Sequence, residues 1–273
     1  MSSSKKNPLS TGRPRIHLDL LVRKRNHPDK GVNDCVCIAL AEPRVDSHKA
    51  LVAGLRRIIP FLYRSLDDVI ELLKKYGVDI GPNLPLPDSF DFQWASTGEF
   101  LMCAYFEECE NTTILSYKWR LNTRRKQHPF GMDLLAFDLT SNPPIIYAVA
   151  VKTTREGGTG KTPTAVYSAV TELSKYFSEE KLDDDLGVIF ANLHTDDATR
   201  RAFEEWYDPY TQEVPSSKPE MIAVPAIVID ERNWNDRYAA HAINYDFGIA
   251  GAVRVLCIHE LEALVNETFT GLI

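Results

Sequence analysis

Two kinds of apolar pattern run through the first part of the chain and predict its elements. Residues 15–23 (RIHLDLLVR) and 35–40 (CVCIAL) alternate apolar and polar positions, which favours strands. Residues 47–77 place apolar side chains at helical spacing instead. Pro60 interrupts this pattern and Gly77 ends it, so we expect a helical segment that is broken at the proline.

A proline-rich stretch follows this helical segment. Residues 79–91 (DIGPNLPLPDSFD) hold three prolines within six residues and predict an extended connector. We place a boundary at this connector. It divides an N-terminal α/β region, residues 1–90, from a main domain, residues 91–273.

The main domain opens with a predicted helix and a predicted hairpin. Residues 95–109 (ASTGEFLMCAYFEEC) begin with Ser96 and Thr97 and continue at helical spacing. Residues 111–121 favour a strand. Residues 131–154 favour two strands joined at the turn sequence SNPP, whose turn chemistry predicts a hairpin.

The rest of the main domain alternates between segments with strand-like and helix-like apolar patterns. Residues 162–177 predict a helix with Thr162 as its cap and Pro163 at its first position. The remaining expected elements are a strand at 186–193, a helix near 196–207, strands at 221–229 and 252–260, and a closing helix. This succession indicates the α/β class.

Composition narrows the class of protein. A chain that is 44% hydrophobic and 25% charged is typical of soluble globular proteins. No apolar run reaches the roughly 18 residues that a membrane-spanning helix needs, and the first residues lack the apolar stretch of a signal peptide. The odd number of cysteines, 5, favours a reducing compartment over a disulfide framework. We therefore expect a cytoplasmic protein without a membrane partner.

Charge is spread unevenly along the chain. The net charge of −7 argues against unspecific adhesion to nucleic acid, yet residues 118–128 (KWRLNTRRKQH) contain basic residues and no acidic ones. The basic side chains of this stretch are Lys118, Arg120, Arg124, Arg125 and Lys126. Such a local patch can contact phosphates, because fields act within a Debye length. It can equally be a solvated, charged hairpin edge.

A glycine-rich loop lies between a strand and a helix at residues 148–170 (AVAVKTTREGGTGKTPTAVYSAV). This order of elements is typical of phosphate-binding loops. The sequence GGTGKT resembles the deviant Walker A loop of ParA/MinD-type ATPases, and this resemblance implies ATP binding through Lys161. That family has a lysine where this chain has Glu156, and Arg155 stands where an ordinary P-loop has its first glycine. The alternative is a flexible turn, with Lys161 in solvent or on a nucleic-acid phosphate.

The predicted hairpin places two polar residues at one end of the sheet. Asp133 opens its first strand and Lys152 lies near the end of its second, so the two side chains should be neighbours. Ala148, Ala150 and Lys152 share one face of the second strand. A lysine that ends a strand of valines and alanines is either a rim charge or a site residue.

This arrangement resembles the PD-(D/E)XK nuclease superfamily, which implies a restriction-endonuclease-like mixed sheet flanked by helices. The matching residues are the helix Glu99 in TGEF, Asp133 in GMD, and Lys152. The resemblance implies that Glu99 and Asp133 hold Mg²⁺ or Mn²⁺, which activates water and clamps the scissile phosphate. It also implies that Lys152 orients this water and offsets phosphoryl charge. Structural explanations remain open: Glu99 would suit the first turn of a helix, and Asp133 a turn.

One residue departs from the superfamily pattern. Where the superfamily has its second carboxylate, this chain has Ala150, which cannot bind a metal. Either the natural protein is catalytically degenerate or Ala150 is an engineered change, and we predict severely reduced cleavage in both cases. On the following helix, Glu172 and Lys175 either face the substrate or form a surface pair at i,i+3 spacing, and the surface pair is the favoured interpretation.

Within this superfamily, residues 94–177 look most like the nuclease-like subunit of Hachiman-type bacterial phage defence. The features in common are the TGE helix, the basic stretch, Gly-x-Asp and the lysine-bearing strand. The resemblance implies DNA as the substrate and a superfamily-2 helicase as the partner. Two other functions stay open: a P-loop ATPase, and a non-catalytic subunit that binds DNA or a helicase.

Overall fold

The computed structural model describes residues 14–27, 31–40, 45–64, 66–77, 84–121, 131–157, 161–193, 195–270 and 272. Its centre is a 6-stranded mixed sheet with the strand order β1-β2-β6-β5-β4-β3. The strands are β1 (Val22–Asn26), β2 (Asp34–Leu40), β3 (Leu134–Asp138), β4 (Ile145–Thr154), β5 (Glu220–Asp230) and β6 (Ala250–Ile258). Strands β2, β6, β5 and β4 are parallel, and the antiparallel strands β1 and β3 form the two edges. The expected α/β fold is confirmed.

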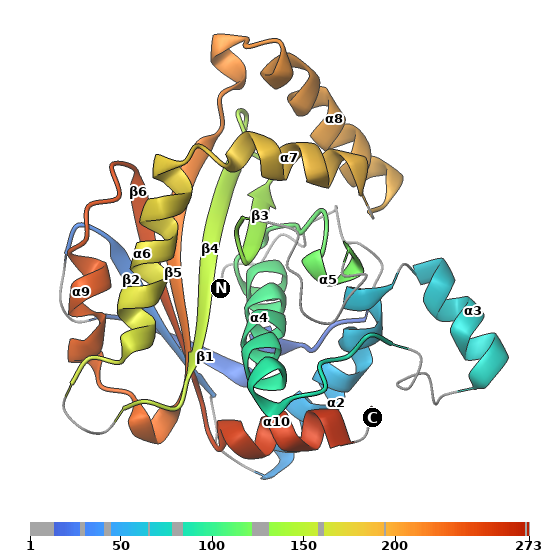
Figure 1. Cartoon of the computed structure of the whole chain (residues 1–273), viewed down its shortest axis with the longest axis vertical. Helices are drawn as coiled ribbons and strands as arrows, with labels where there is room; N and C mark the ends of the chain where they lie inside the picture. The colour runs from blue at the N-terminus through green and yellow to red at the C-terminus, as the bar shows by residue number, and fades with distance from the viewer. Residues whose placement is uncertain are drawn as a thin grey trace, which may run out of the picture.

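Helices cover both faces of the sheet, as Figure 1 shows for α4 and α6 on either side of β4. One layer consists of α1 (Leu18–Leu21), α2 (Val45–Tyr63), α4 (Phe90–Cys109), α5 (Lys118–Leu121) and α10 (Leu261–Thr270). The other consists of α6 (Thr164–Ser178), α7 (Leu182–Ala191), α8 (Asp197–Thr211) and α9 (Ala240–Ile243). Helix α3 (Leu66–Tyr76) follows α2, and 3₁₀ turns lie at Pro215–Ser217, Glu231–Asn233 and Asp236–Ala239.

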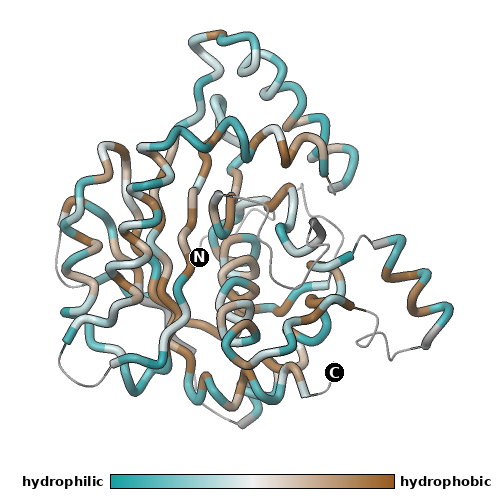
Figure 2. The backbone as a smooth tube through the Cα atoms, in the orientation of Figure 1, coloured by the Kyte–Doolittle hydropathy of each residue, from teal (hydrophilic) through white to brown (hydrophobic). Residues whose placement is uncertain are grey.

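Alternation along β4 explains why both faces are covered. Val149 and Val151 pack into the layer of α4, whereas Ala148 and Ala150 pack into the layer of α6. Parallel strands with two covered faces have near-continuous apolar sequences, and Figure 2 shows hydrophobic stretches along the central strands. None of the described helices is long and apolar enough to cross a lipid bilayer.

The N-terminal region contributes strands to the same sheet as the main domain. Strand β2 pairs in parallel with β6, and β1 extends the sheet beyond β2. The boundary that we placed at residues 90 and 91 stays a prediction. Strands from both sides of it share one hydrogen-bonded sheet.

Three segments that we predicted as strands differ in the structure. Residues 186–193 belong largely to helix α7, where Leu186 and Ile189 are buried and Phe190 is exposed. A short apolar run does not distinguish a strand from a buried helix. Within residues 15–23, Leu18–Leu21 form the short helix α1, and β1 begins at Val22. Residues 111–121 end in helix α5, and Thr113 makes an isolated bridge to Phe137.

Helix boundaries also differ from the expected ones. Helix α2 continues through Pro60 to Tyr63, because the carbonyl of Pro60 still accepts the N–H of Arg64 at 3.0 Å. Gly77 follows α3 with a φ of 71°, the left-handed conformation typical of a helix stop, as predicted. Helix α4 begins at Phe90, so Ser96 and Thr97 are buried inside it rather than capping it.

Candidate active site

The β3–β4 hairpin brings Asp133 and Lys152 together, as its pattern predicts. The strands are antiparallel, with Leu134 opposite Val149, so Asp133 lies beside the residues that follow Val149. The backbone N–H of Val151 donates to Asp133 Oδ2 at 2.9 Å. Lys152 Nζ approaches the same oxygen at 3.3 Å. The carboxylate of Asp133 is therefore fixed by the backbone and the side chain of β4.

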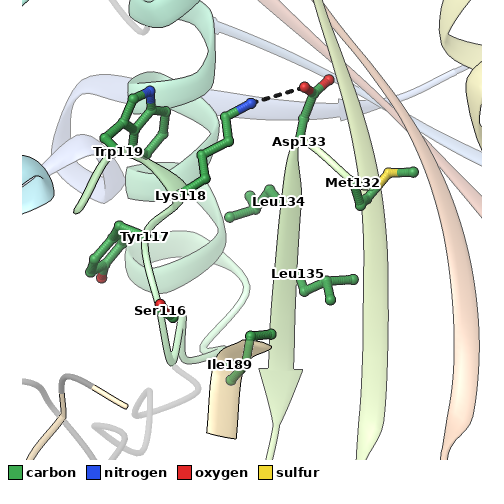
Figure 3. Close-up of a pocket in the computed structure, with 9 residues that line it drawn as sticks. All are labelled: Ser116, Tyr117, Lys118, Trp119, Met132, Asp133, Leu134, Leu135 and Ile189. Carbon is green, nitrogen blue, oxygen red and sulfur yellow. Dashed lines mark hydrogen bonds and ion pairs between the residues drawn. The ribbon is translucent and has the colours of Figure 1, made fainter. Parts of the chain in front are cut away.

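Glu99, on helix α4, is joined to Asp133 by the ammonium group of a lysine. Lys118 Nζ donates to Glu99 Oε1 at 2.8 Å and to Asp133 Oδ1 at 3.0 Å. Figure 3 shows the Lys118 side chain extended toward Asp133. The Lys118 side chain is 2% exposed, so this ammonium group is a buried link between the two carboxylates. The three residues of the nuclease pattern thus meet at one end of the hairpin, with Lys118 among them.

A glycine allows α4 to approach β4 at this position. A Cβ atom on Gly98 would lie 1.9 Å from Thr153 Oγ1, closer than real Cβ contacts. The helix and the strand touch at this pair, one residue from Glu99 and one from Lys152. Glu99 lies in the middle of α4, so the helix dipole at a first turn does not explain its presence.

Glu172 is a further acidic residue of the site, for which our reading of the sequence favoured a surface pair instead. Glu172 Oε2 lies 2.5 Å from Lys152 Nζ, whereas Lys175 pairs with Glu179 at 3.6 Å. The expected surface pair of Glu172 with Lys175 is therefore wrong. Position 172 neighbours the buried stripe of α6, and Lys152 points to the face of β4 that α6 covers. These two features of the pattern could have identified the contact.

Five charged side chains thus alternate in sign across the end of the sheet, in the order Glu99, Lys118, Asp133, Lys152 and Glu172. We call this arrangement the charge chain. It links helix α4 on one face to helix α6 on the other through the hairpin. Three carboxylates and two ammonium groups leave one formal negative charge when all are ionised.

Burial and neighbouring charges separate the acidities of these groups. Burial raises the pKa of Glu99 to about 7, and the charge of Asp133 adds to this effect, while Lys118 opposes it. Burial also acts to raise the pKa of Asp133, but the charges of Lys118 and Lys152 outweigh it and lower that pKa to about 2. Asp133 is therefore a permanent anion, and Glu99 exchanges its proton near neutrality.

Burial and neighbouring charges also shift the pKa values of the two lysines and of Glu172. Burial acts to lower the pKa of each lysine, but the carboxylates beside them outweigh burial and raise it. Burial, followed by the charge of Asp133, raises the pKa of Glu172, while Lys152 opposes this effect. Both lysines are consequently cations at neutral pH.

A second aspartate holds the turn that carries Asp133. The N–H of Gly131 donates to Asp185 Oδ1 of α7 at 2.9 Å. Asp185 is 3% exposed. The turn borders a small pocket, drawn in Figure 3, lined by Ser116, Tyr117, Lys118, Trp119, Met132, Asp133, Leu134, Leu135 and Ile189. Asp185 therefore holds the turn that leads into Asp133.

The basic residues predicted to contact nucleic acid have different surroundings. Lys118 is buried and paired with two carboxylates, which corrects the expectation of a surface contact to phosphate. The side chain of Arg120 and the whole of Arg124, Arg125 and Lys126 lie outside the described residues. Lys161 is exposed at the start of the segment that leads into α6.

A carboxylate occupies the position at the N-terminus of α6 where a phosphate-binding loop would place a phosphate. Glu156 Oε2 accepts the N–H of Thr164, the first residue of α6, at 2.7 Å. Thr162, the cap that we predicted, makes no such bond, and Pro163 occupies the cap position. An acidic side chain at this helix N-terminus repels phosphate. This contact weighs against the P-loop interpretation.

The carboxylates of the charge chain have the chemistry of a site for a hard divalent cation. Their oxygens are the ligands that Mg²⁺ and Mn²⁺ prefer. Glu99 Oε2 is buried and has no hydrogen-bond partner among the described residues, so one acceptor oxygen of the site is unsatisfied. In the described part of the chain, no three His, Cys, Asp or Glu side chains stand close enough to hold a metal as folded. The ammonium groups of Lys118 and Lys152 lie between the carboxylates instead.

Comparisons with known proteins agree with the sequence resemblance. A search among curated proteins gave no match. A family model described as HamA matches residues 16–269, nearly the whole chain and far more than residues 94–177, on which the resemblance depends. HamA is the subunit of Hachiman-type defence to which that resemblance pointed. The chain therefore belongs to the HamA family and is a phage-defence subunit.

Proposed function

We propose that this chain is a metal-dependent nuclease subunit that acts on DNA within its anti-phage defence complex. The observation that carries the proposal is the convergence of Glu99, Asp133 and Lys152 at the end of the β3–β4 hairpin. These residues come from three separate elements and match the nuclease pattern in both type and order. Membership of a defence family supports a nucleic-acid target, because phage genomes are such targets.

Glu99 and Asp133 are the residues that would hold Mg²⁺ or Mn²⁺. When bound, this cation supplies Lewis-acid activation of a water molecule and neutralises charge on the scissile phosphate. Asp133 is anionic throughout the physiological range because two lysines lower its pKa. The buried ammonium of Lys118 must leave its place between the two carboxylates for both of them to contact one cation.

Lys152 has the position of a residue that acts on the reacting phosphate. Its side chain is 26% exposed, and Asp133 and Glu172 hold its ammonium group in place. A fixed cation there would orient the attacking water and offset the charge that builds on the phosphoryl oxygens. Lys152 would therefore act in the reaction, whereas the buried Lys118 would balance the charges of Glu99 and Asp133 when no metal is bound.

The basic residues that follow Lys118 are proposed to contact the DNA backbone. Arg120 comes two positions after a side chain of the site, and Arg124, Arg125 and Lys126 follow in the sequence. Such contacts position DNA without reading its sequence. Lys161, exposed before α6, would add a further phosphate contact. A helicase is the proposed protein partner, which would license cleavage.

Plasmid degradation tests this proposal. Ala150 provides no metal ligand, so the chain as it stands should cut DNA very weakly, and Ala150→Glu should restore cutting that requires Mg²⁺ or Mn²⁺. Adding Asp133→Asn to Ala150→Glu should abolish this cutting again. The assay is run with and without the proposed helicase partner. Absence of cation-dependent cleavage of any DNA or RNA by Ala150→Glu would refute the proposal.

A second candidate is a non-catalytic subunit that binds DNA or a helicase. The observation in its favour is that two lysines already balance the buried carboxylates without a metal. In this case Ala150→Glu would not cut DNA, while binding to DNA or to the helicase would persist. The third candidate, a P-loop ATPase, predicts thermal stabilisation by ATP that Lys161→Ala abolishes, and the Glu156 contact opposes it.

A further inference from the structure

We propose that Arg155, held over the rings of Phe90 and Trp94, binds a backbone phosphate of the DNA on which the charge chain would act. This proposal rests on the proposed function, because it concerns the same substrate. Arg155 is the first residue after β4 and follows Lys152 by three positions. The proposal therefore assigns a phosphate contact to a residue that lies outside both the basic stretch 118–128 and the nuclease pattern.

Residue spacing on helix α4 brings the two rings to this position. Phe90, Trp94 and Gly98 recur at every fourth residue, so they lie along one face of the helix. Gly98 lies against Thr153 of β4, and Figure 1 shows α4 alongside this strand. One and two turns earlier, the rings of Trp94 and Phe90, with centroids 5.8 Å apart, meet Arg155. The packing that brings α4 to the charge chain therefore also places two rings beside Arg155.

The guanidinium group of Arg155 is held in place without being neutralised. Its Cζ atom lies 4.4 Å from the ring centroid of Phe90 and 4.5 Å from that of Trp94. Aromatic faces attract a guanidinium cation, and two of them restrict its side chain. Arg155 is exposed, and among the described residues no carboxylate forms an ion pair with it. The rings therefore orient a cation whose charge remains for a partner outside the described part of the chain.

The carboxylates next to Arg155 are held by other donors. Glu156 Oε2 accepts the N–H of Thr164 at 2.7 Å. Asp230, at the end of the neighbouring strand β5, accepts two hydrogen bonds from the guanidinium group of Arg232, at 2.9 and 3.0 Å. The N–H donors of Arg155 are consequently left for an acceptor that comes from another molecule.

The position of Arg155 favours a DNA phosphate as this acceptor. A guanidinium group donates two parallel hydrogen bonds to the oxygens of a phosphate. In an extended chain, the three positions from Lys152 to Arg155 span about 10 Å. One strand of DNA rises about 3.4 Å per nucleotide, so a strand with its scissile phosphate at Lys152 would pass Arg155 about three nucleotides away. An acidic protein segment offers similar oxygens, but its binding would have no relation to Lys152.

DNA binding by the full chain in EDTA tests the proposal without metal or cleavage. Fluorescence anisotropy measures the affinity for labelled duplex and single-stranded DNA of several sequences, at a series of salt concentrations. Arg155→Met keeps an unbranched side chain on the rings, and Arg155→Lys keeps the charge. Arg237→Met is the matched control, because Arg237 is also exposed and lies over a ring, that of Tyr238, at 5.8 Å. Its neighbour Asp236 pairs with Arg25 of β1, the edge strand farthest from β3. Thermal unfolding confirms that each variant is folded.

We expect Arg155→Met to weaken DNA binding about tenfold, and to do so equally for all sequences. It should also reduce the slope of log affinity against log salt concentration by about 1, because one phosphate contact is lost. Arg155→Lys should retain this slope, and Arg237→Met should change neither the affinity nor the slope. If Arg155 only supported the packing of α4, Arg155→Met would leave the slope unchanged.

The proposal is overturned if Arg155→Met has the salt slope of the unchanged chain. It is also overturned if Arg155→Met loses binding to the proposed helicase partner while DNA binding persists, since Arg155 would then contact protein. The proposed function survives both results, provided that Ala150→Glu cuts DNA. If the unchanged chain binds no DNA, with or without that partner, both proposals fail.

Discussion

Glu99 and Asp133 contact the same ammonium group, that of Lys118, at 2.8 and 3.0 Å. The two carboxylates come from α4 and from the turn before β3, and their side chains are 9% and 17% exposed. An ammonium group between them balances their charge in the absence of a metal. The same nitrogen lies where a cation bound by both carboxylates would lie. Lys118 and a divalent cation should therefore compete for one place.

This competition predicts two effects of Lys118→Met. Without metal, the variant leaves two buried carboxylates without their shared cation and should lose about 3 kcal/mol of unfolding free energy. With Mn²⁺, it should gain more stability than the unchanged chain, because no tethered cation has to be displaced. Thermal unfolding in EDTA and in Mn²⁺ measures both effects. Lys161→Met, at an exposed lysine, is the control and should show neither. Equal stabilisation of both chains by Mn²⁺ would contradict the competition.

The raised pKa of Glu99 predicts a specific dependence of stability on pH. The folded chain retains the Glu99 proton up to about pH 7, whereas the unfolded chain loses it at the lower ordinary pKa of a glutamate. A raised pKa stabilises the fold below the unfolded value, and this contribution is lost as the pH rises through 7. Asp133 has a lowered pKa and loses its contribution only in strong acid.

Glu99→Gln isolates this effect, since glutamine does not titrate. Between about pH 5 and about pH 8, the unchanged chain should lose up to roughly 3 kcal/mol of unfolding free energy relative to the variant. Denaturant unfolding in EDTA at a series of pH values gives this difference. A constant difference between the two chains across this range would show that Glu99 has an ordinary pKa.

Gly98 is expected to be essential for the approach of α4 to β4. In Gly98→Ala the new Cβ would lie 1.9 Å from Thr153 Oγ1, so the Thr153 side chain or the helix must shift, and overpacking of this kind costs about 1–3 kcal/mol. Gly187→Ala is a matched change in α7, where no heavy atom lies within 4 Å of the added Cβ. It should stabilise the fold by about 0.5–1 kcal/mol. Combining Gly98→Ala with Thr153→Ala should recover most of the loss, and a failure of this rescue would locate the clash elsewhere.

The sequence predicts the hairpin and the meeting of Asp133 with Lys152 because both depend on local rules. Two apolar runs joined by the turn sequence SNPP within residues 131–154 define two strands, and antiparallel pairing then fixes which ends are adjacent. Glu99 is a harder case, because its position depends on a helix packing across the sheet. The TGE sequence nevertheless marks it, since the glycine before it permits that packing.

Lys118 and Glu172 show where local patterns are insufficient. Lys118 stands in a basic stretch, and composition alone indicates a solvated surface, whereas tertiary packing turns this one side chain inward to two carboxylates. Glu172 and Lys175 have the spacing of a helical pair, but Lys152 from the neighbouring strand is the nearer partner of Glu172. In α7, three aspartates at the first turn were a helix signal that the apolar run 186–193 obscured.

Asp185 gives the last prediction, which concerns the turn before β3. Asp185→Ala removes the acceptor of the Gly131 N–H, and a buried donor without its partner costs about 1–3 kcal/mol. Asp185→Asn keeps an oxygen at this position and should cost less. Asp184→Ala changes the exposed neighbour on α7 and should leave stability nearly unchanged. Because the turn carries Asp133, Asp185→Ala should also weaken Mn²⁺ binding, while Asp184→Ala should not. If Asp185→Ala lowered stability but left Mn²⁺ binding intact, Asp185 would support the fold without positioning Asp133.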